Sequence, residues 1–238
     1  VGSEMCIRDS LGTFIDDPDD EVHLEAVRSY CAEMHVARLS PRAARARSLT
    51  GLLSGEALSL PYYRNAGLRD WVANTCASKR IDHAVIFSSV MADYVPDMTR
   101  LSTLVDFVDL DSAKWTQYAA THRWPLSWLY RREGERLLAW ERAVAAKATH
   151  SFFVTEAEAD LFRRAAPESA SRVDAISNGV DAEFFSPDHV LASPYSAAEV
   201  PVVFTGAMDY WPNIDGAVWF AADVMPRVKQ LYPEARFY

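Results

Sequence analysis

Four polar residues directly follow two apolar segments of this 238-residue chain. Ser88 and Ser89 come after the letters AVIF, and Asp109 and Asp111 come after LVDFV. The carboxyl ends of parallel strands lie at one edge of a sheet and face a crevice, so we expect these side chains to line a cleft. Carboxylates and hydroxyls in such a place can contact the hydroxyl groups of a ligand.

The neighbouring residues leave simpler interpretations open for part of this pattern. Asp111 or Ser112 could instead cap a helix that begins there. Lys114 is near enough in sequence to pair with an aspartate, or to meet a phosphate on an acceptor. No Ser-His-Asp or Cys-His arrangement is found, and the six histidines have no metal-ligand spacing, so we predict no metal site.

Apolar runs alternate with segments of helical spacing along most of the chain. Runs that are apolar throughout are typical of parallel strands in a sheet with helices on both faces. We therefore expect an α/β fold with a Rossmann-like parallel sheet. Strands are expected at 11–16, 35–40, 83–89, 102–111, 150–156 and 173–177. Helices are expected at 17–34, 41–55, 66–80, from the end of the fourth strand to about 149, and at 156–165, with Asp17 and Thr155 as caps.

The chain divides by composition into a tail, two domains and a linker. Residues 1–10 have neither strand nor helix periodicity, resemble translated adapter sequence, and are treated as a non-native or disordered tail. Residues 11–185 are expected to form the first domain. Ser, Pro and Ala are concentrated at 186–201, which predicts a linker, and 202–238 is expected to be the first strand-helix unit of a second Rossmann-like domain.

A glycine stands between a strand and a helix in VVFTGAMDYWPN, at the start of the second domain. Because Gly206 has no side chain, its backbone can approach a phosphate, and a helix starting near Pro212 would direct its N-terminal amides the same way. Asn178 and Gly179, in ISNGVDAEFFSP, taken alone are an ordinary turn pair, since both residues tolerate positive φ.

The bulk composition excludes several classes of protein. A net charge of −9 and a pI near 5.1 argue against nucleic acid as the main partner. Three scattered cysteines predict neither a disulfide framework nor a cysteine zinc site, and they suit a reducing cytoplasm. No apolar run approaches the roughly 18 to 20 residues that cross a bilayer, so we expect a soluble or at most peripheral protein.

The order of these motifs resembles a known family. ISNGVDAEFFSP, then a linker, then VVFTGAMDYWPN, is similar to the domain junction of family 4-type glycosyltransferases, which have two Rossmann domains (the GT-B fold). LGTFIDDPDD, LPYYRN, VDFVDLDSAKW and GAMDYWPN look more narrowly like the sugar transferases of exosortase (PEP-CTERM) exopolysaccharide systems. The resemblance covers the chain from about residue 11 to its end.

This resemblance implies an enzyme that carries a sugar from a nucleotide-sugar donor to a polysaccharide or lipid-linked acceptor, with no cofactor. The acceptor would bind mainly to the first domain, and the donor mainly to the second. Asp109 would stand where many relatives have a histidine, contacting acceptor hydroxyls or the charge that develops on the sugar. The residues implied to bind substrate are Ser88, Ser89, Asp111, Lys114, Asn178, Gly179, Gly206, Asp209 and Asn213.

The sequence departs from the family pattern in three ways. Many relatives have Arg and Lys shortly after the glycine of the donor domain, whereas this chain has Asp209, Tyr210 and Asn213, of which Asn213 could equally be a cap. The E-x7-E helix that the family uses against the donor sugar would lie beyond Tyr238. The glycine-rich turn after the family's first strand is also missing, so we expect this chain alone to have little or no transfer activity.

The segment 123–144 mixes arginines with tryptophans and tyrosine. A basic, aromatic helix start of this kind could lie against anionic lipid at the inner membrane. Glu133, Glu135 and Glu141 dilute the positive charge and favour a helix with one buried and one solvated face.

Two other functions are left open by the sequence. A non-catalytic Rossmann-like binding or regulatory module is the alternative to the transferase. A dinucleotide oxidoreductase is disfavoured, because no G-x-G-x-x-G opens a helix.

Overall fold

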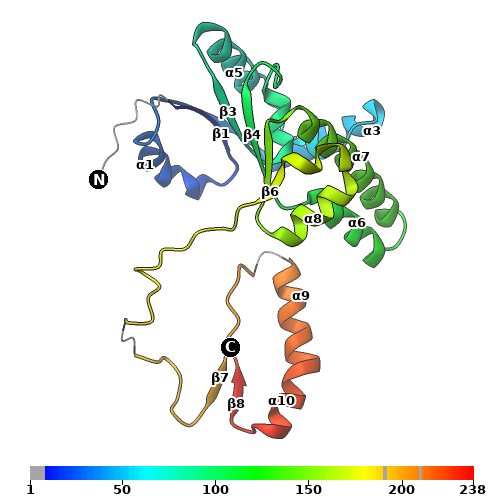
Figure 1. The fold of residues 1–238 in the computed structure, drawn as a ribbon. Coiled ribbons are helices and arrows are strands. Elements are labelled where there is room, and N and C mark those ends of the chain that lie inside the picture. Colours follow the sequence, from blue (N-terminus) through cyan, green and yellow to red (C-terminus); the bar gives the residue numbers. More distant parts are fainter. Residues whose placement is uncertain (1–8, 190–191, 209–210) are drawn as a thin grey trace. The chain divides into compact units, whose positions relative to one another are not determined.

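The structure, a computed structural model, describes residues 9–189, 192–208 and 211–238 (Figure 1). Contacts divide the chain into two compact units, Val1–Asn178 and Gly179–Tyr238. The boundary therefore falls earlier than the linker expected at 186–201. Most of the expected tail, residues 1–8, lies outside the described residues.

The first unit contains a four-stranded parallel sheet in the order β3-β4-β5-β6. Its strands are β3 (His83–Phe87), β4 (Ser102–Val108), β5 (His150–Phe153) and β6 (Val173–Ala175). The α/β class and the Rossmann-like parallel sheet expected from the sequence are confirmed. Each strand is shorter than its apolar run, because the polar residues after it already belong to turns or helices.

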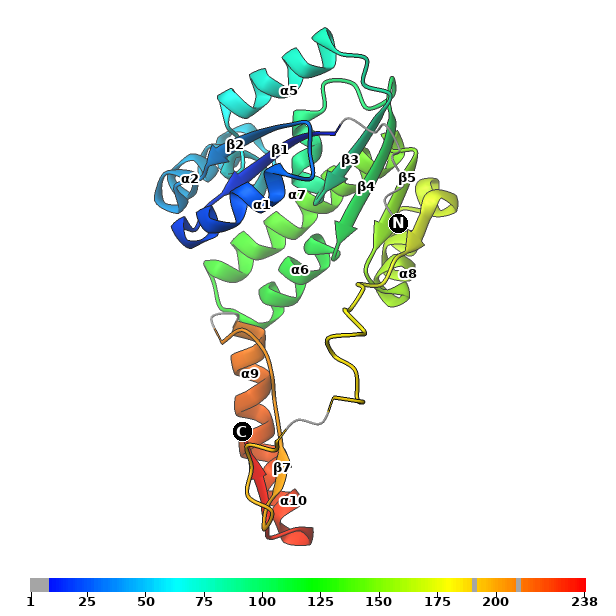
Figure 2. The same ribbon diagram turned by 90° about the vertical axis from the view of Figure 1, so that its left-hand side faces the viewer.

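A second, two-stranded parallel sheet pairs β1 (Ser10–Ile15) with β2 (Glu33–Arg38). Figure 2 shows this pair apart from the four-stranded sheet. The helix expected at 17–34 is instead the 3-10 helix η1 (Pro18–His23) followed by the short helix α1 (Leu24–Arg28). Asp17 caps this segment as expected, since its Oδ1 accepts the N–H of Asp19 at 2.9 Å.

The remaining helices of the first unit are α2 (Pro41–Ser48), α3 (Thr50–Ser54), α4 (Ser59–Tyr62), α5 (Ala66–Ser78), η2 (Ser89–Tyr94), α6 (Asp111–Thr121), α7 (Leu126–Lys147), α8 (Glu156–Ala165) and η3 (Pro167–Arg172). They include those that were expected, but the helical region up to about 149 is divided into two helices, and α4, η2 and η3 were not expected. The helix expected at 41–55 is split into α2 and α3, and Gly55 ends it with φ 78°, a left-handed conformation that suits glycine.

The main core lies between the four-stranded sheet and the helices α7 and α8. Val105, Phe107 and Phe153 from the sheet pack with Val144 of α7 and Phe162 of α8. Alternate residues of the strands point the other way, and there Val85 and Phe87 are 76% and 66% exposed. The described helices thus bury one face of this sheet more completely than the other.

Helices α6 and α7 run side by side in close contact (Figure 2). Gly134 of α7 allows this approach. A Cβ atom at position 134 would lie 2.6 Å from Thr116 Oγ1 and 2.9 Å from the carbonyl oxygen of Ser112, both on α6. Side-chain carbon atoms essentially never come so near, so any larger residue must push the two helices apart.

Substituting Gly134 by alanine should therefore lower the free energy of unfolding by about 1 to 2 kcal/mol, because overpacking outweighs the gain of about 1 kcal/mol in helix propensity. Gly216→Ala is the matched control. Gly216 lies in the helix of the second unit, and a Cβ there meets nothing within 4 Å, so it should gain about 0.5 to 1 kcal/mol locally. Hydrogen exchange of the helix amides reports both, and equal effects of the two changes would contradict the packing argument.

The second unit is a strand-helix-strand unit. Its elements are β7 (Val200–Val202), α9 (Trp211–Trp219), the π-helical segment η4 (Phe220–Val224), α10 (Met225–Leu231) and β8 (Ala235–Phe237), and β7 and β8 are parallel. The expected strand begins two residues early, and the pairing continues to Phe204, whose N–H donates to the carbonyl of Tyr238 at 2.9 Å. The sequence did not predict β8.

The π-helical segment has a local cause. Pro226 has no N–H to donate to the preceding turn, and its ring crowds the carbonyl four residues earlier. Widening the helix over Phe220–Val224 relieves this conflict while α9 and α10 stay on one continuous helical path.

Candidate functional site

The ends of β3 and β4 are held in an unusual backbone conformation. Ser88 and Val108 have φ values of 69° and 65°, and in the described part of the chain they are the residues other than glycine with positive φ. Asp106 joins them. Its carbonyl oxygen accepts the N–H of Ser88 at 2.7 Å, and its Oδ1 accepts the N–H of Val108 at 2.9 Å.

Val108 forms a tight turn at the end of β4. The N–H of Asp109 donates to the carbonyl of Phe107 at 2.9 Å, which closes a γ-turn around Val108. Positive φ is costly for a β-branched residue, of the order of 1 to 3 kcal/mol, and strain of this size is concentrated at functional sites. The turn aims the chain from the end of β4 directly into Asp109.

Asp109 lies on the surface beside a second carboxyl group, that of Glu158, which was not expected as a site residue. Glu158 of α8 accepts the N–H of Leu110 at 3.3 Å. Burial is the main cause that raises the pKa of Glu158, and the neighbouring Asp109 and Asp111 raise it further. A neighbouring negative charge disfavours ionisation of a carboxyl group, so the two aspartates act on Glu158 in the same direction as burial.

Asp111 is half-buried at the first residue of α6. Burial raises its pKa, Lys114 lowers it, and Asp109 raises it again. Lys114 Nζ lies 3.9 Å from Asp111 Oδ1, as the pairing interpretation expected. The capping interpretation is wrong, because neither Asp111 nor Ser112 caps α6 with its side chain.

A glutamate from α7 caps α6 instead. Glu141 is fully buried, and its Oε1 accepts the N–H of Ser112 at 3.2 Å. Its Oε2 has no hydrogen-bond partner. Burial raises the pKa of Glu141 to about 8, against the lowering effect of its hydrogen bonds with Ser112. No local sequence pattern predicts this contact, since the two residues are 29 positions apart in the chain.

The two serines after β3 differ in their surroundings. Ser88 is half-buried at the start of η2. Ser89 is buried, and its carbonyl oxygen accepts Nε1–H of Trp140 at 2.9 Å. The structure therefore brings Ser88 to the strand edge that carries Asp109, whereas the Ser89 side chain does not reach the solvent.

Tyr63 links the two sheets at their carboxyl ends and was not predicted as a site residue. Burial is the main cause that raises its pKa, and Tyr62, Asp16 and Asp111 raise it further. Asp16 directly follows β1, and Asp111 follows β4. The rule that polar residues after parallel strands face one edge would also have found Asp16.

A hydrogen-bond network holds the segment that carries Tyr63. The Tyr94 hydroxyl donates to the Tyr63 carbonyl and accepts the N–H of Asn65 at 2.8 Å. The Arg47 guanidinium donates to the carbonyls of Pro61 and Tyr62, each at 2.6 Å. These bonds fix the three consecutive carbonyls of the LPYYRN stretch.

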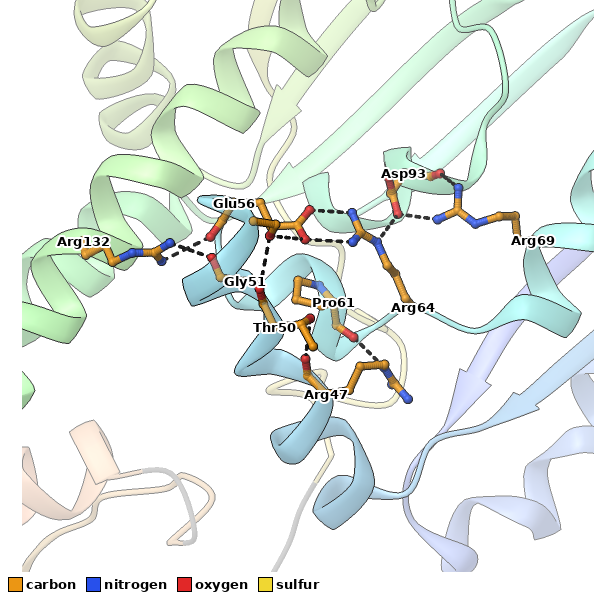
Figure 3. Close-up of polar contacts among 10 residues, drawn as sticks. Arg47, Thr50, Gly51, Glu56, Pro61, Arg64, Arg69, Asp93 and Arg132 are labelled. Atoms are coloured by element: carbon orange, nitrogen blue, oxygen red, sulfur yellow. Dashed lines mark hydrogen bonds and ion pairs between the residues drawn. The ribbon is translucent and has the colours of Figure 1, made fainter.

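Figure 3 shows the charged part of this network. Arg64 forms two hydrogen bonds with Glu56, at 2.9 and 2.6 Å, and a third with Asp93 at 3.1 Å. Arg69 binds the same Asp93 oxygen at 2.6 Å. Each carboxylate is thus matched by a guanidinium group, which makes this cluster a support for the segment.

A cavity of the first unit lies away from Asp109, Asp111 and Glu158. It has a volume of about 310 Å³, and its lining includes Arg69, Asp93, Asp97, Trp140 and Lys147. None of the site residues expected from the sequence lines it. We therefore base the candidate site on the strained strand ends.

The expected residues of the second unit are only partly brought together. A Cβ at Gly206 would lie 2.8 Å from Asn213 Nδ2, so Asn213 already fills the space beside this glycine. Asn213 Nδ2 donates to the carbonyl of Ala207 at 3.0 Å, which ties the turn to α9 and is not a helix cap. Asp209 lies outside the described residues.

Asn178 and Gly179 stand at the boundary of the two units. Both are exposed, neither has positive φ, and no turn is formed there. The expected Asn-Gly turn is therefore wrong, because no hairpin or return of the chain demands it at an extended connection between units.

The clustered carboxyl groups are of a type that can accept hydrogen bonds from the hydroxyl groups of a ligand. Across the described ranges, no group of three His, Cys, Asp or Glu side chains is placed to hold a metal ion. Cys31 and Cys76 are free thiols. Helices long and apolar enough to pass through a bilayer are absent from residues 9–189, 192–208 and 211–238.

No protein-family model matches the chain, and no curated protein sequence matches it either.

Proposed function

We propose that the chain is a piece of a GT-B glycosyltransferase and that its first unit forms the acceptor side of the enzyme. The observation that carries this proposal is the strained end of β4, which presents Asp109 beside Glu158, Asp111 and Lys114. Sugar acceptors are rich in hydroxyl groups, and clustered carboxyl groups are suited to bind them. The resemblance of the junction and of VDFVDLDSAKW to sugar transferases supports the same assignment.

The proposed chemistry needs no covalent nucleophile from this unit. The donor sugar loses its bond to the nucleotide diphosphate, an acceptor oxygen forms the new glycosidic bond, and the hydroxyl proton passes to the departing diphosphate. Asp109 would accept the hydrogen bond of the acceptor hydroxyl and stabilise positive charge on the sugar as that bond breaks. Lys114 would contact a phosphate on a lipid-linked acceptor.

The second unit would begin the donor side. Its parallel strand-turn-helix-strand order is that of a nucleotide-binding unit, and its turn holds Gly206 at the end of the first strand. The nucleotide sugar is treated as substrate, and no further cofactor is proposed. We place the reaction in a bacterial cytoplasm, on the path to an exopolysaccharide.

The test uses the protein encoded by the complete gene that contains this sequence. Asp109→Asn should lower the rate of sugar transfer at least tenfold, because one hydrogen bond to a charged group is worth about 1.5 to 3 kcal/mol. Asp70→Asn is the matched control, since Asp70 is an exposed aspartate on α5. Radiolabelled transfer from a panel of nucleotide sugars measures both variants.

Two results would count against the assignment. A complete protein that transfers no sugar from any donor but binds nucleotide would favour the non-catalytic binding module. Equal rates for the Asp109 and Asp70 variants would remove Asp109 from the site.

A further inference from the structure

An exposed apolar surface on the first unit is used by none of the contacts described so far. Large apolar side chains stand out near α3 and at the start of α7, with Leu53 92% and Trp124 81% exposed. We call these residues, together with the exposed arginines around them, the apolar-basic patch. The patch consists of Leu49, Leu52, Leu53, Trp124, Leu126 and Trp128 with Arg42, Arg45, Arg123 and Arg131.

The two segments of the patch are joined in space. Arg132, in the second turn of α7, donates to the carbonyls of Gly51 at 2.7 Å and Glu56 at 3.1 Å (Figure 3). Gly51 lies in α3 beside Leu52 and Leu53, and Trp128 lies one turn before Arg132. The α3 and α7 segments of the patch are thus held next to each other, although 76 and 81 residues separate Arg132 from its two partners in the sequence.

The structure removes the reason that argued against a basic surface here. Glu133 and Glu141 were expected to dilute the positive charge of 123–144, but they are 2% and 0% exposed. Each turns inward and accepts hydrogen bonds at the start of another helix. Of those three glutamates, only Glu135 stays in the solvent.

The arginines of the patch are available to a partner. Among the described residues, Arg42, Arg45, Arg123 and Arg131 form no ion pair. The chain as a whole carries a net charge of −9, so this local basic surface opposes the overall charge. A second copy of the chain would place like charges against each other if it used the same patch. Charge complementarity therefore points to an anionic occupant that also accepts apolar side chains.

We propose that the apolar-basic patch docks the first unit on an anionic lipid surface. The leucines of α3 and the tryptophans before and in α7 enter the boundary between headgroups and acyl chains, where amphipathic aromatic rings are favoured. The arginines bind the lipid phosphates around them. This inference does not rest on the proposed sugar transfer, since lipid binding is measured without donor or acceptor.

The test is co-sedimentation of residues 1–238 with vesicles of 30% phosphatidylglycerol in phosphatidylcholine. We expect binding that is lost in pure phosphatidylcholine and weakened by salt. Leu53→Ser should weaken partitioning about tenfold, because Leu53 would no longer be buried in lipid. Arg42→Ser and Arg45→Ser should each weaken it roughly fivefold. Arg132 is not substituted, because it holds α3 to α7.

Matched controls come from the second unit. Leu231 and Arg227 of α10 are exposed residues of the same two types, but they lie outside the patch. Leu231→Ser and Arg227→Ser should leave partitioning unchanged. Circular dichroism checks that every variant is folded. The proposal is overturned by absence of binding to the anionic vesicles, or by control variants that weaken it as much as the patch variants. It is also overturned if Leu53→Ser abolishes self-association in lipid-free solution, because the patch would then bind a second copy.

Discussion

Glu133→Ala should lower the free energy of unfolding by about 3 kcal/mol. The buried carboxylate accepts three hydrogen bonds, from the N–H groups of Leu58 at 2.6 Å and Ser59 at 2.9 Å and from the Ser59 hydroxyl at 2.6 Å. These are the orphan donors at the beginning of α4. Alanine leaves these partly buried donors without their acceptor, and an unsatisfied buried group costs about 1 to 3 kcal/mol, so a total near the low end for three donors is expected.

Glu135→Ala is the matched control for this prediction, because Glu135 lies two residues further on α7 but in the solvent. Its effect should stay within about 0.5 kcal/mol. Urea denaturation followed by circular dichroism measures both variants, and hydrogen exchange at α4 locates the loss. An alanine variant at 133 as stable as the one at 135 would show that the carboxylate does not hold α4.

Glu141→Gln should raise the free energy of unfolding, and the size of this increase should depend on pH. The folded protein holds the proton of Glu141 up to about pH 8, whereas the unfolded chain releases it near pH 4.5. Between these values unfolding releases a proton, so the free energy of unfolding falls as the pH rises. The limiting slope is about 1.4 kcal/mol per pH unit for one group.

Glutamine keeps an oxygen for the N–H of Ser112 but cannot ionise. We therefore expect the variant to match the native protein near pH 4.5 and to be more stable by at least about 1 kcal/mol at pH 8. Asp111 and Glu158 also have raised pKa values, and they contribute equally to both proteins. Denaturation at pH 5, 6.5 and 8 gives the comparison, with Glu135→Gln as the exposed control. Parallel stability curves for the native protein and Glu141→Gln would refute it.

The local part of the fold could be predicted because its causes lie close together in the sequence. Asp17 and Thr155 were recognised as caps from the residues beside them, and both accept the expected backbone N–H, Thr155 Oγ1 that of Glu158 at 3.2 Å. The parallel strands followed from apolar runs between helices. β8 was missed because ARF is a short and partly polar segment that becomes a strand by pairing with β7.

The candidate site was predictable only where one rule sufficed. Asp109, Asp111 and Ser88 follow strands, and the structure places them at the same sheet edge. Glu158 and Glu141 come from α8 and α7, which lie many residues after this sheet edge in the sequence. They reach the edge through tertiary contacts, which no local sequence pattern predicts. Tyr63 stood within LPYYRN, whose resemblance to a family marked the stretch without indicating the role of the ring.

Asp106 connects the loop after β3 to the turn after β4. Its main chain secures the residue after β3, and its carboxylate secures the turn after β4. A displacement of Ser88 by an incoming molecule would therefore pull on the same aspartate that sets the direction of Asp109. A ligand that binds at one loop is therefore expected to affect the position of the other.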